Sequence, residues 1–374
     1  MNRLLFAINV GWYYDLHWKS RVHSSMTSSM ETHLCMSKPT DANEENMHEM
    51  SLTRSSKGLF DNLRTLTQAI FIYRKVKPTI IHSVTIKPNL MFGLIALLTK
   101  TPILITIPGL GSMFSQTTLL SRSVATVVMF FYRIVGLNTK AVFIFENSQD
   151  KQLFLDKSIC KASDAVTVPG SGVNLAEYQA SPITTEKQPL KLLFAARLLE
   201  GKGLRELLET VKELKAEGED IELNVAGIID DDSNESIPLH EIETWHRDGH
   251  IRWLGQVNEG MCQVIASNDA VVLPTRYGEG LPRILIEANA CRRAVITTDI
   301  GGCREFIQNG RNGILVPVCD ASALKKAIRR LLDREYCAEL GAWGRERVEE
   351  AFTDKHVVDS YTKIYNRHLT DLSE

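Results

Sequence analysis

Two glutamates that stand eight residues apart mark the segment of this 374-residue chain whose residue types most clearly suggest chemistry. Glu279 is expected in a loop directly after the apolar run AVVLP. Glu287 is expected on the second turn of the following helix, which Leu281 and Pro282 open. Gly280 can expose backbone N–H groups there, and the free N–H groups of a helix N-terminus suit a diphosphate. Both carboxylates can then reach one ligand from different depths, although a solvated helix face would also explain Glu287 taken alone.

Two basic residues in an earlier segment, FAARLLEGKGLRELLE, are candidates to meet the same anion. Arg197 follows an expected strand, and Lys202 stands between Gly201 and Gly203 at an expected turn from strand to helix. Charge that develops on a diphosphate leaving group can be met by fixed cations and helix dipoles. Each charge-assisted contact would contribute about 1.5–3 kcal/mol. We therefore expect both bases to bind a diphosphate, although either one alone would be read as an ordinary surface base.

Other ligand signatures are incomplete or absent. The GLG triplet at 109–111 lacks the third glycine of a dinucleotide fingerprint because Phe114 stands in its place, and no GxxxxGK[ST] motif occurs. His246 and His250 have a spacing that could suit a metal, but no third ligand is suggested, so no metal site is expected. The seven cysteines include no C-x-x-C pair, which favours reduced thiols over a zinc site or a disulfide framework.

Two parallel sheets with crossover helices are expected to position these residues, because short β-branched runs alternate with longer amphipathic segments. The strands are expected over 4–10, 79–83, 103–107, 141–145 and 165–168, and then over 191–195, 221–225, 251–254, 270–273, 294–297 and 313–316. A polar segment at 178–190 with two prolines separates the two halves. We predict an α/β protein with two doubly wound, Rossmann-like domains facing a cleft: 1–180 and 181–355, followed by 356–374 as a helix that can pack back on the first domain.

Two polar segments, 24–56 and 229–240, are expected to be loops. The first is long enough to be a lid or an acceptor loop, and simple disorder is an equal alternative. Residues 101–121 carry no charge, but prolines and glycines interrupt them, so no membrane-spanning helix is expected there.

Charge is unevenly distributed along the chain. Residues 51–145 hold eleven Lys and Arg side chains and one acid, Asp61. This excess predicts that the first domain meets an anionic membrane surface, although a solvated rim of bases scattered around the domain would also explain it. By contrast, the net charge of −2 and the absence of an arginine-rich tail or zinc-finger spacing disfavour nucleic acid as a partner.

The segment 274–305 strongly resembles the E-x7-E signature of retaining nucleotide-sugar glycosyltransferases of family 4, which adopt the GT-B fold. The resemblance extends over nearly the whole chain: VPGSGVNLAEY matches the usual exit from the first domain, and NGRNGILVP matches a late strand. The motifs EGLPR, GCRE and HSVTIKPNLMFGLIA look like the bacterial subgroup that extends undecaprenyl-diphosphate-linked sugars.

The resemblance implies transfer of a hexose or an N-acetylhexosamine from a nucleotide diphosphate sugar, most simply UDP-linked, to a lipid-diphosphate-linked sugar. The transfer would proceed with retention, without a metal or other cofactor, in the assembly of a surface polysaccharide such as O-antigen, capsule or glycan. The enzyme would be cytoplasmic and peripheral on the inner face of the cell membrane. Arg197 and Lys202 would bind the donor diphosphate, and Glu279 would hold the donor sugar beside the reacting carbon. Glu287 would bind the ribose, and the loop 280–282 would complete the donor site.

The acceptor side is expected in the first domain. NVGWYYDLHW resembles NVDWFFLSHR of relatives, with Gly11 in place of an Asp and Trp18 in place of an Arg. His17 is a candidate acceptor residue, although a lone histidine is more often structural, and Lys87 and Asn89 are the other candidates. The segment ITIPGLGSM lacks the histidine that touches the donor sugar in many relatives. Two alternatives stay open: a nucleotide-sugar 2-epimerase on the same fold, and a non-catalytic scaffold that binds sugar nucleotides.

Overall fold

The computed structural model describes residues 2–24, 27, 30–41, 45–52, 59–110, 119–181, 183, 188–230, 233, 235–276 and 280–370. The chain divides into two compact units. Unit 1 comprises Met1–Gly170 and Lys355–Glu374, and unit 2 comprises Ser171–Asp354. Unit 1 thus ends ten residues before the boundary expected at 180, and the C-terminal segment belongs to it.

Unit 1 contains a parallel sheet of seven strands in the order β3-β2-β1-β4-β5-β6-β7. The strands are β1 Asn2–Val10, β2 Met30–Ser37, β3 Met47–Glu49, β4 Ile80–Val84, β5 Ile103–Ile107, β6 Ala141–Phe145 and β7 Ala165–Thr167. The central strands β4 and β5 are buried at every residue, as expected for parallel strands covered on both faces.

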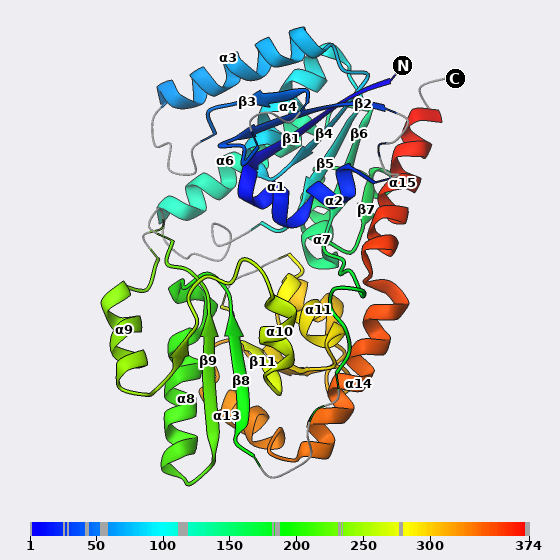
Figure 1. The fold of residues 1–374 in the computed structure, drawn as a ribbon. Coiled ribbons are helices and arrows are strands. Elements are labelled where there is room, and N and C mark those ends of the chain that lie inside the picture. The colour runs from blue at the N-terminus through cyan, green and yellow to red at the C-terminus, as the bar shows by residue number, and fades with distance from the viewer. Residues whose placement is uncertain are drawn as a thin grey trace. The chain divides into compact units, whose positions relative to one another are not determined.

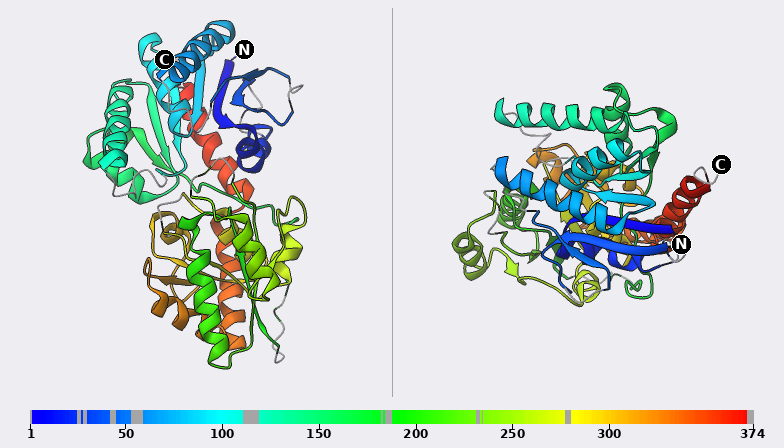
Figure 2. Two further views of the ribbon diagram at one scale, coloured as in Figure 1. Left: turned by 90° about the vertical axis from the view of Figure 1, so that its left-hand side faces the viewer. Right: turned by 90° about the horizontal axis from the view of Figure 1, so that it is seen from above.

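Helices cover both faces of this sheet (Figures 1 and 2). They are α1 Gly11–His17, α2 Lys19–Val22, α3 Leu59–Val76, α4 Ile86–Thr99, α6 Leu119–Val135, α7 Ser148–Asp156 and α15 Asp354–Thr370, with a short 3-10 turn at Ala162–Asp164. Residues of α3, α4, α6 and α7 share one core with Leu5 and Ile81, whereas α1, α2 and α15 share the other core with Phe6.

The C-terminal helix α15 is attached to unit 1 through a buried histidine. The two ring nitrogens of His82, on β4, form hydrogen bonds with the Tyr365 hydroxyl at 2.6 Å and the Thr106 hydroxyl at 2.7 Å. Burial lowers the pKa of His82 to about 3, so the ring is neutral at physiological pH. Trp18 is also fully buried, and the centre of its ring lies 5.3 Å from that of Tyr361.

The expectation of a loop over 24–56 is wrong for two parts of that segment. Strands β2 and β3 lie within it, and β2 pairs with β1 on one side and with β3 on the other. The loop was expected because the segment is rich in polar residues, and β2 itself contains Glu31 and His33. The structure nevertheless buries Leu34, Cys35 and Met36. Backbone pairing with neighbouring strands therefore determines this part of the sheet.

Unit 2 contains a parallel sheet of six strands in the order β10-β9-β8-β11-β12-β13. The strands are β8 Leu190–Ala195, β9 Ile221–Ala226, β10 Arg252–Trp253, β11 Ala270–Leu273, β12 Ala294–Thr298 and β13 Ile314–Val316. The helices are α8 Leu204–Ala216, α9 Leu239–Arg247, α10 Met261–Ala266, α11 Arg283–Ala290, α12 Gly301–Phe306, α13 Ala321–Arg330 and α14 Arg334–Ala351, with a 3-10 turn, η2, at Glu200–Lys202. All eleven strands expected from the sequence are present within two residues of their expected bounds.

The helices of unit 2 pack in pairs on their sheet. Helix α8 lies beside α13, and α11 lies against α14 (Figures 1 and 2). Apolar residues from these helices and from the strands form one continuous core. Among the described residues, no helix combines the length and the apolar content that a membrane span requires.

Candidate functional site

The donor-side candidates follow two neighbouring strands of unit 2. From β8 the chain continues to β9 and β10 on one side of the sheet, and from β11 it continues to β12 and β13 on the other. Ligands of open parallel sheets bind outside the carboxyl ends of the strands at such a reversal. Arg197 and Lys202 follow β8, and residues 280–287 follow β11, so the topology brings both groups to the reversal.

The turn that carries Lys202 packs directly against the segment after β11. Gly203 has φ +82°, and a Cβ atom built on it would lie 2.2 Å from the Pro274 carbonyl oxygen. The Arg276 backbone N–H donates to the Gly201 carbonyl at 2.8 Å. Glycine is therefore required at 203 both for the left-handed conformation and for the close backbone approach. Lys202 itself is largely buried, at 9% exposure.

Arg197 is held by an aspartate that the sequence did not single out. Its Nη1 donates to Asp230 Oδ2 at 2.6 Å. The Asp230 backbone N–H donates to the Ser236 hydroxyl at 2.9 Å, and its carbonyl accepts from the Ser233 N–H at 2.9 Å. The segment 229–240 was expected only to be a polar loop, and Ile237 within it is fully buried. Asp230 is thus a fixed partner of the candidate diphosphate-binding arginine.

Helix α11 begins where the sequence predicted an anion-binding helix start. Pro282 occupies the position before the helix, and its carbonyl accepts from the Leu285 N–H at 3.1 Å. Leu281 is buried at 5% exposure, and Gly280 is partly exposed. No side chain among the described residues caps this N-terminus, and the first turn carries no acidic residue. The partial positive charge of the helix end is therefore not neutralised by these neighbours.

Glu287 lies on α11, in a polar cluster at 7% exposure. Its Oε1 accepts a hydrogen bond from the Tyr178 hydroxyl at 2.9 Å and one from Arg283 Nε at 2.7 Å. Burial, together with the charge of the Glu287 carboxylate, raises the pKa of Tyr178 well above its usual value. Tyr178 and Arg283 were not predicted as part of this cluster. Glu279, the predicted catalytic residue, lies outside the described residues.

The acceptor-side candidates follow the corresponding strands of unit 1, where the strand order reverses between β1 and β4. His17 ends α1, after β1, and its ring lies 4.5 Å from that of Tyr13. Lys87 is in the first turn of α4, after β4. Burial lowers the pKa of Lys87, and the nearby Asp61 carboxylate opposes this shift.

Asn89 lies deeper than the other two acceptor candidates. It is fully buried, and its Nδ2 donates to the Thr106 carbonyl at 2.9 Å and to the Tyr132 hydroxyl at 3.2 Å. The first bond joins α4 to β5 and the second joins α4 to α6. A role in acceptor binding stays a prediction for Asn89.

Two backbone features at the same edge of unit 1 were not predicted. Thr85, which precedes α4, has φ 75° and ψ 161°, an unusual conformation for a β-branched residue. Backbone strain of this kind is concentrated at functional sites. Gly11 is required after β1, because a Cβ atom there would lie 2.4 Å from the Lys38 carbonyl oxygen. An Asp at this position would not fit this backbone.

The described residues contain no group of three His, Cys, Asp or Glu side chains that could hold a metal ion. His246 Nδ1 lies 3.3 Å from the Ile251 carbonyl oxygen, a contact between the last turn of α9 and the residue before β10. The independence from metal stays a prediction.

Two family models match the chain, one in each unit. The model described as "Glycosyl transferase 4-like" matches residues 3–146, within unit 1. The model described as "Glycosyl transferases group 1" matches residues 176–347, within unit 2, and this range includes Arg197, Lys202 and Glu287. The residues that the topology brings to one edge of the second sheet thus lie in a glycosyltransferase domain.

Two curated relatives match over most of the chain. The capsular polysaccharide biosynthesis glycosyltransferase CapM of Staphylococcus aureus is 26% identical over 331 residues, which are 84% of this chain and 83% of the relative. The N,N'-diacetylbacillosaminyl-diphospho-undecaprenol alpha-1,3-N-acetylgalactosaminyltransferase of Campylobacter jejuni is 24% identical over 332 residues, which are 86% of this chain and 85% of the relative.

The fold is shared with solved structures. HepE from Anabaena, solved in complex with UDP, matches with a TM-score of 0.75 at 14% sequence identity, over 99% of this chain and 100% of that chain. The predicted pair of Rossmann-like parallel-sheet domains is therefore confirmed. Taken with the two family models and the relatives, these findings show that the chain is a glycosyltransferase with the GT-B fold.

Proposed function

We propose that the protein transfers a sugar from a UDP-linked donor to a lipid-diphosphate-linked sugar acceptor, with retention, in the assembly of a bacterial surface polysaccharide. One observation carries the donor half of this proposal. Two bases, Arg197 and Lys202, follow β8 at the reversal of the second sheet. The N-terminus of α11, which no side chain of the described residues caps, follows the adjacent strand β11. A diphosphate is the ligand group that two fixed cations and a helix N-terminus recognise together.

Each donor group has a residue to meet it in this arrangement. Arg197 and Lys202 neutralise the diphosphate as the bond to the sugar breaks, without a metal ion. Glu287 Oε1 is engaged by Tyr178 and Arg283, and we assign Oε2, which receives neither bond, to a ribose hydroxyl. Glu279 is assigned to the donor sugar hydroxyls, where its charge would stabilise the developing cation at the anomeric carbon. Retention follows from the resemblance to family 4.

The names of the relatives support the assignment of donor and acceptor. HepE was solved with UDP, and the Campylobacter relative is named for transfer to a diphospho-undecaprenol-linked sugar. CapM is named for capsular polysaccharide biosynthesis. On the acceptor side we assign Lys87 to the acceptor diphosphate, and we assign His17 and Asn89 to the neighbouring part of the same site. The sugar transferred would be a hexose or an N-acetylhexosamine.

A lipid-linked acceptor places the enzyme at a membrane, and we propose peripheral binding at the cytoplasmic face. Helix α6 has no acidic residue, and Val127 and Phe130 on it are more than half exposed, between the exposed bases Arg122 and Arg133. Exposed apolar side chains flanked by bases suit an anionic bilayer, where each base near the surface contributes about 1 kcal/mol. The excess of bases over acids in 51–145 also supports binding of unit 1 to an anionic bilayer.

A panel of nucleotide sugars, each incubated with a synthetic lipid-diphosphate sugar and analysed by mass spectrometry, tests this function. The expected product is the acceptor plus one sugar, formed equally well in EDTA and with unchanged anomeric configuration. Donor turnover without an acceptor would instead identify a 2-epimerase. Binding of UDP with no turnover of any donor would identify a scaffold.

A further inference from the structure

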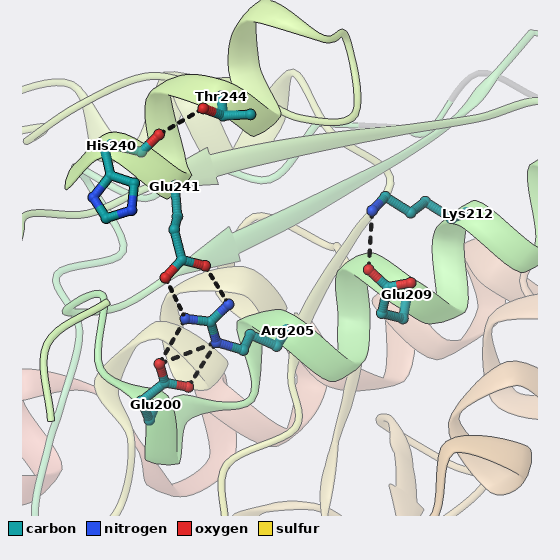
Figure 3. A network of polar contacts seen from close by, with 7 residues as sticks. All are labelled: Glu200, Arg205, Glu209, Lys212, His240, Glu241 and Thr244. Atoms are coloured by element: carbon teal, nitrogen blue, oxygen red, sulfur yellow. Dashed lines mark hydrogen bonds and ion pairs between the residues drawn. The ribbon is translucent and has the colours of Figure 1, made fainter. Parts of the chain in front are cut away.

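One arginine that is not assigned to the donor, Arg205, forms paired hydrogen bonds with each of two carboxylates (Figure 3). Arg205 is the second residue of α8. Its Nε donates to both carboxylate oxygens of Glu200, at 3.0 and 2.8 Å, and its Nη2 donates to Glu200 Oε1 at 2.8 Å. On the other side, Nη1 and Nη2 donate to the two oxygens of Glu241 at 2.5 and 3.0 Å. The guanidinium carbon also lies 5.2 Å from the centre of the Trp245 ring.

This network differs from an ordinary surface ion pair. Single exposed pairs contribute little to stability, but paired Arg–carboxylate bonds of ideal geometry that form a network are the recognised exception. The hydrogen bonds that Arg205 donates to Glu241 and to Glu200 raise the pKa of Arg205, and the bond to Glu241 lowers the pKa of that carboxyl. Both shifts favour the charged forms. A lysine could supply the charge of Arg205 but not the planar fork.

The network links the turn that carries Lys202 to helix α9, which is anchored in the core of unit 2. Glu200 begins that turn, and its backbone N–H donates to the Glu235 carbonyl at 2.8 Å. Glu241 lies on α9, and the next residue, Ile242, is fully buried in the core of unit 2. Because α9 is anchored there, Arg205 holds one side of the turn in place.

Backbone contacts hold the other side of the same turn. Gly203 packs against the Pro274 carbonyl, and the Gly201 carbonyl accepts from the Arg276 N–H. Lys202 therefore belongs to a three-residue turn that is fixed on both sides, and Arg205 supplies the side-chain half of that support. A cation held in this way loses less conformational freedom when it meets an anion than a free surface lysine does.

We propose that Arg205 is a positioning residue for the donor diphosphate: it touches no part of the donor and acts by fixing the turn that carries Lys202. The proposal rests on the proposed function of this site. Loss of the fork would allow the Lys202 ammonium to move relative to the phosphates. Phosphate-dependent binding should then weaken, whereas binding of the nucleoside part should not change.

Calorimetry with UDP and with uridine tests the proposal on three variants of the full chain. Arg205→Lys keeps the charge and removes the fork, and Arg205→Ala removes both. Lys212→Ala is the matched control, because Lys212 pairs with Glu209 at 2.9 Å on the same helix but contacts neither η2 nor α9 (Figure 3). We expect about tenfold weaker binding of UDP by Arg205→Lys, with unchanged uridine binding, and no change in either affinity for the control.

A double variant shows whether Arg205 acts through Lys202. If it does, Arg205→Lys combined with Lys202→Ala should bind UDP no more weakly than Lys202→Ala alone, because the positioned group is already absent. Additive losses would overturn the proposal. So would an Arg205→Lys protein whose thermal midpoint falls while its UDP-to-uridine affinity ratio stays at the wild-type value, since that pattern marks a purely structural role.

The same data separate this inference from the proposed function. If the wild-type protein binds UDP no better than uridine, the proposed donor site is wrong. If the wild-type protein prefers UDP and Arg205→Lys keeps the full preference, the donor site stands and the positioning role is wrong.

Discussion

Arg197 Nη1 lies 2.6 Å from Asp230 Oδ2, so the arginine assigned to the donor diphosphate has a carboxylate partner in the segment that follows the neighbouring strand β9. Asp230 is held in turn by the Ser236 hydroxyl and the Ser233 N–H. If Arg197 binds the donor diphosphate as proposed, the diphosphate would share the guanidinium with a fixed negative charge. Asp230 would then reduce the net charge that the donor meets at this point.

Replacing Asp230 by Asn should tighten UDP binding about fivefold, because the amide has nearly the same shape and removes a like charge near the phosphates. Calorimetry at low salt measures this change, and uridine binding should stay constant. The gain should shrink when Arg197→Ala is present in the same chain. Weaker UDP binding by Asp230→Asn would mean instead that the carboxylate is needed to orient Arg197.

Arg197→Ala and Lys202→Ala should each weaken UDP binding by about 1.5–3 kcal/mol, because each removes a charge-assisted contact to the diphosphate. Uridine, which lacks the phosphates, should bind as before. Titration of each variant with both ligands makes the comparison. Equal losses for UDP and uridine would show that these bases do not meet the phosphates.

Glu279→Ala should lower turnover about 100-fold or more while changing UDP affinity little, because the contacts of its carboxylate matter most as charge develops at the anomeric carbon. Initial rates with saturating donor and acceptor measure the effect. Turnover at the wild-type rate would remove Glu279 from the mechanism.

Gly203→Ala and Gly218→Ala make a matched pair at the two ends of α8. Both glycines have left-handed φ angles, +82° and +93°, so each substitution should cost about 1–2 kcal/mol of backbone strain. Gly218 has open space around its Cβ position, whereas a Cβ at Gly203 would clash with the Pro274 carbonyl. Denaturant unfolding should show a larger loss of stability for Gly203→Ala, which should also weaken UDP binding. Equal losses with unchanged UDP affinity would contradict the tight packing of the Lys202 turn.

Binding to anionic vesicles should depend on the exposed bases of α3 and the residue after it. The protein should sediment with anionic vesicles at low salt, less at high salt, and less with neutral vesicles. A variant with Gln in place of four bases should sediment less: Arg64, Arg74, Lys75 and Lys77. A control variant should replace four exposed bases of unit 2 and sediment normally: Lys215, Arg247, Arg252 and Lys326.

The exposed apolar residues of α6 have their own test. Val127→Ser with Phe130→Ser should reduce sedimentation at every salt concentration, since apolar insertion is not screened by ions. Equal sedimentation on neutral and anionic vesicles, or none on either, would contradict electrostatic docking and leave the transferase assignment intact.

The sequence by itself determined the fold class and the places where the chemistry should lie. Runs such as AVVL at β11 and ILITI at β5 are apolar throughout because parallel strands are buried on both faces, and such a pattern is visible locally. Gly203 is likewise visible, as a glycine between a strand and a helix, and the motifs around Arg197 and Glu287 indicated a donor site. The catalytic role of Glu279 stays a prediction.

The tertiary structure alone decided which partners these residues have. Tyr178 and Glu287 are 109 residues apart, and Arg205 and Glu241 are 36 apart, yet each pair is hydrogen-bonded. Strands β2 and β3 also escaped prediction, because their stability comes from pairing with neighbouring strands more than from their own residues. Local patterns report burial and backbone conformation. Contacts between distant residues depend on the order of strands in the sheet, and no local pattern records that order.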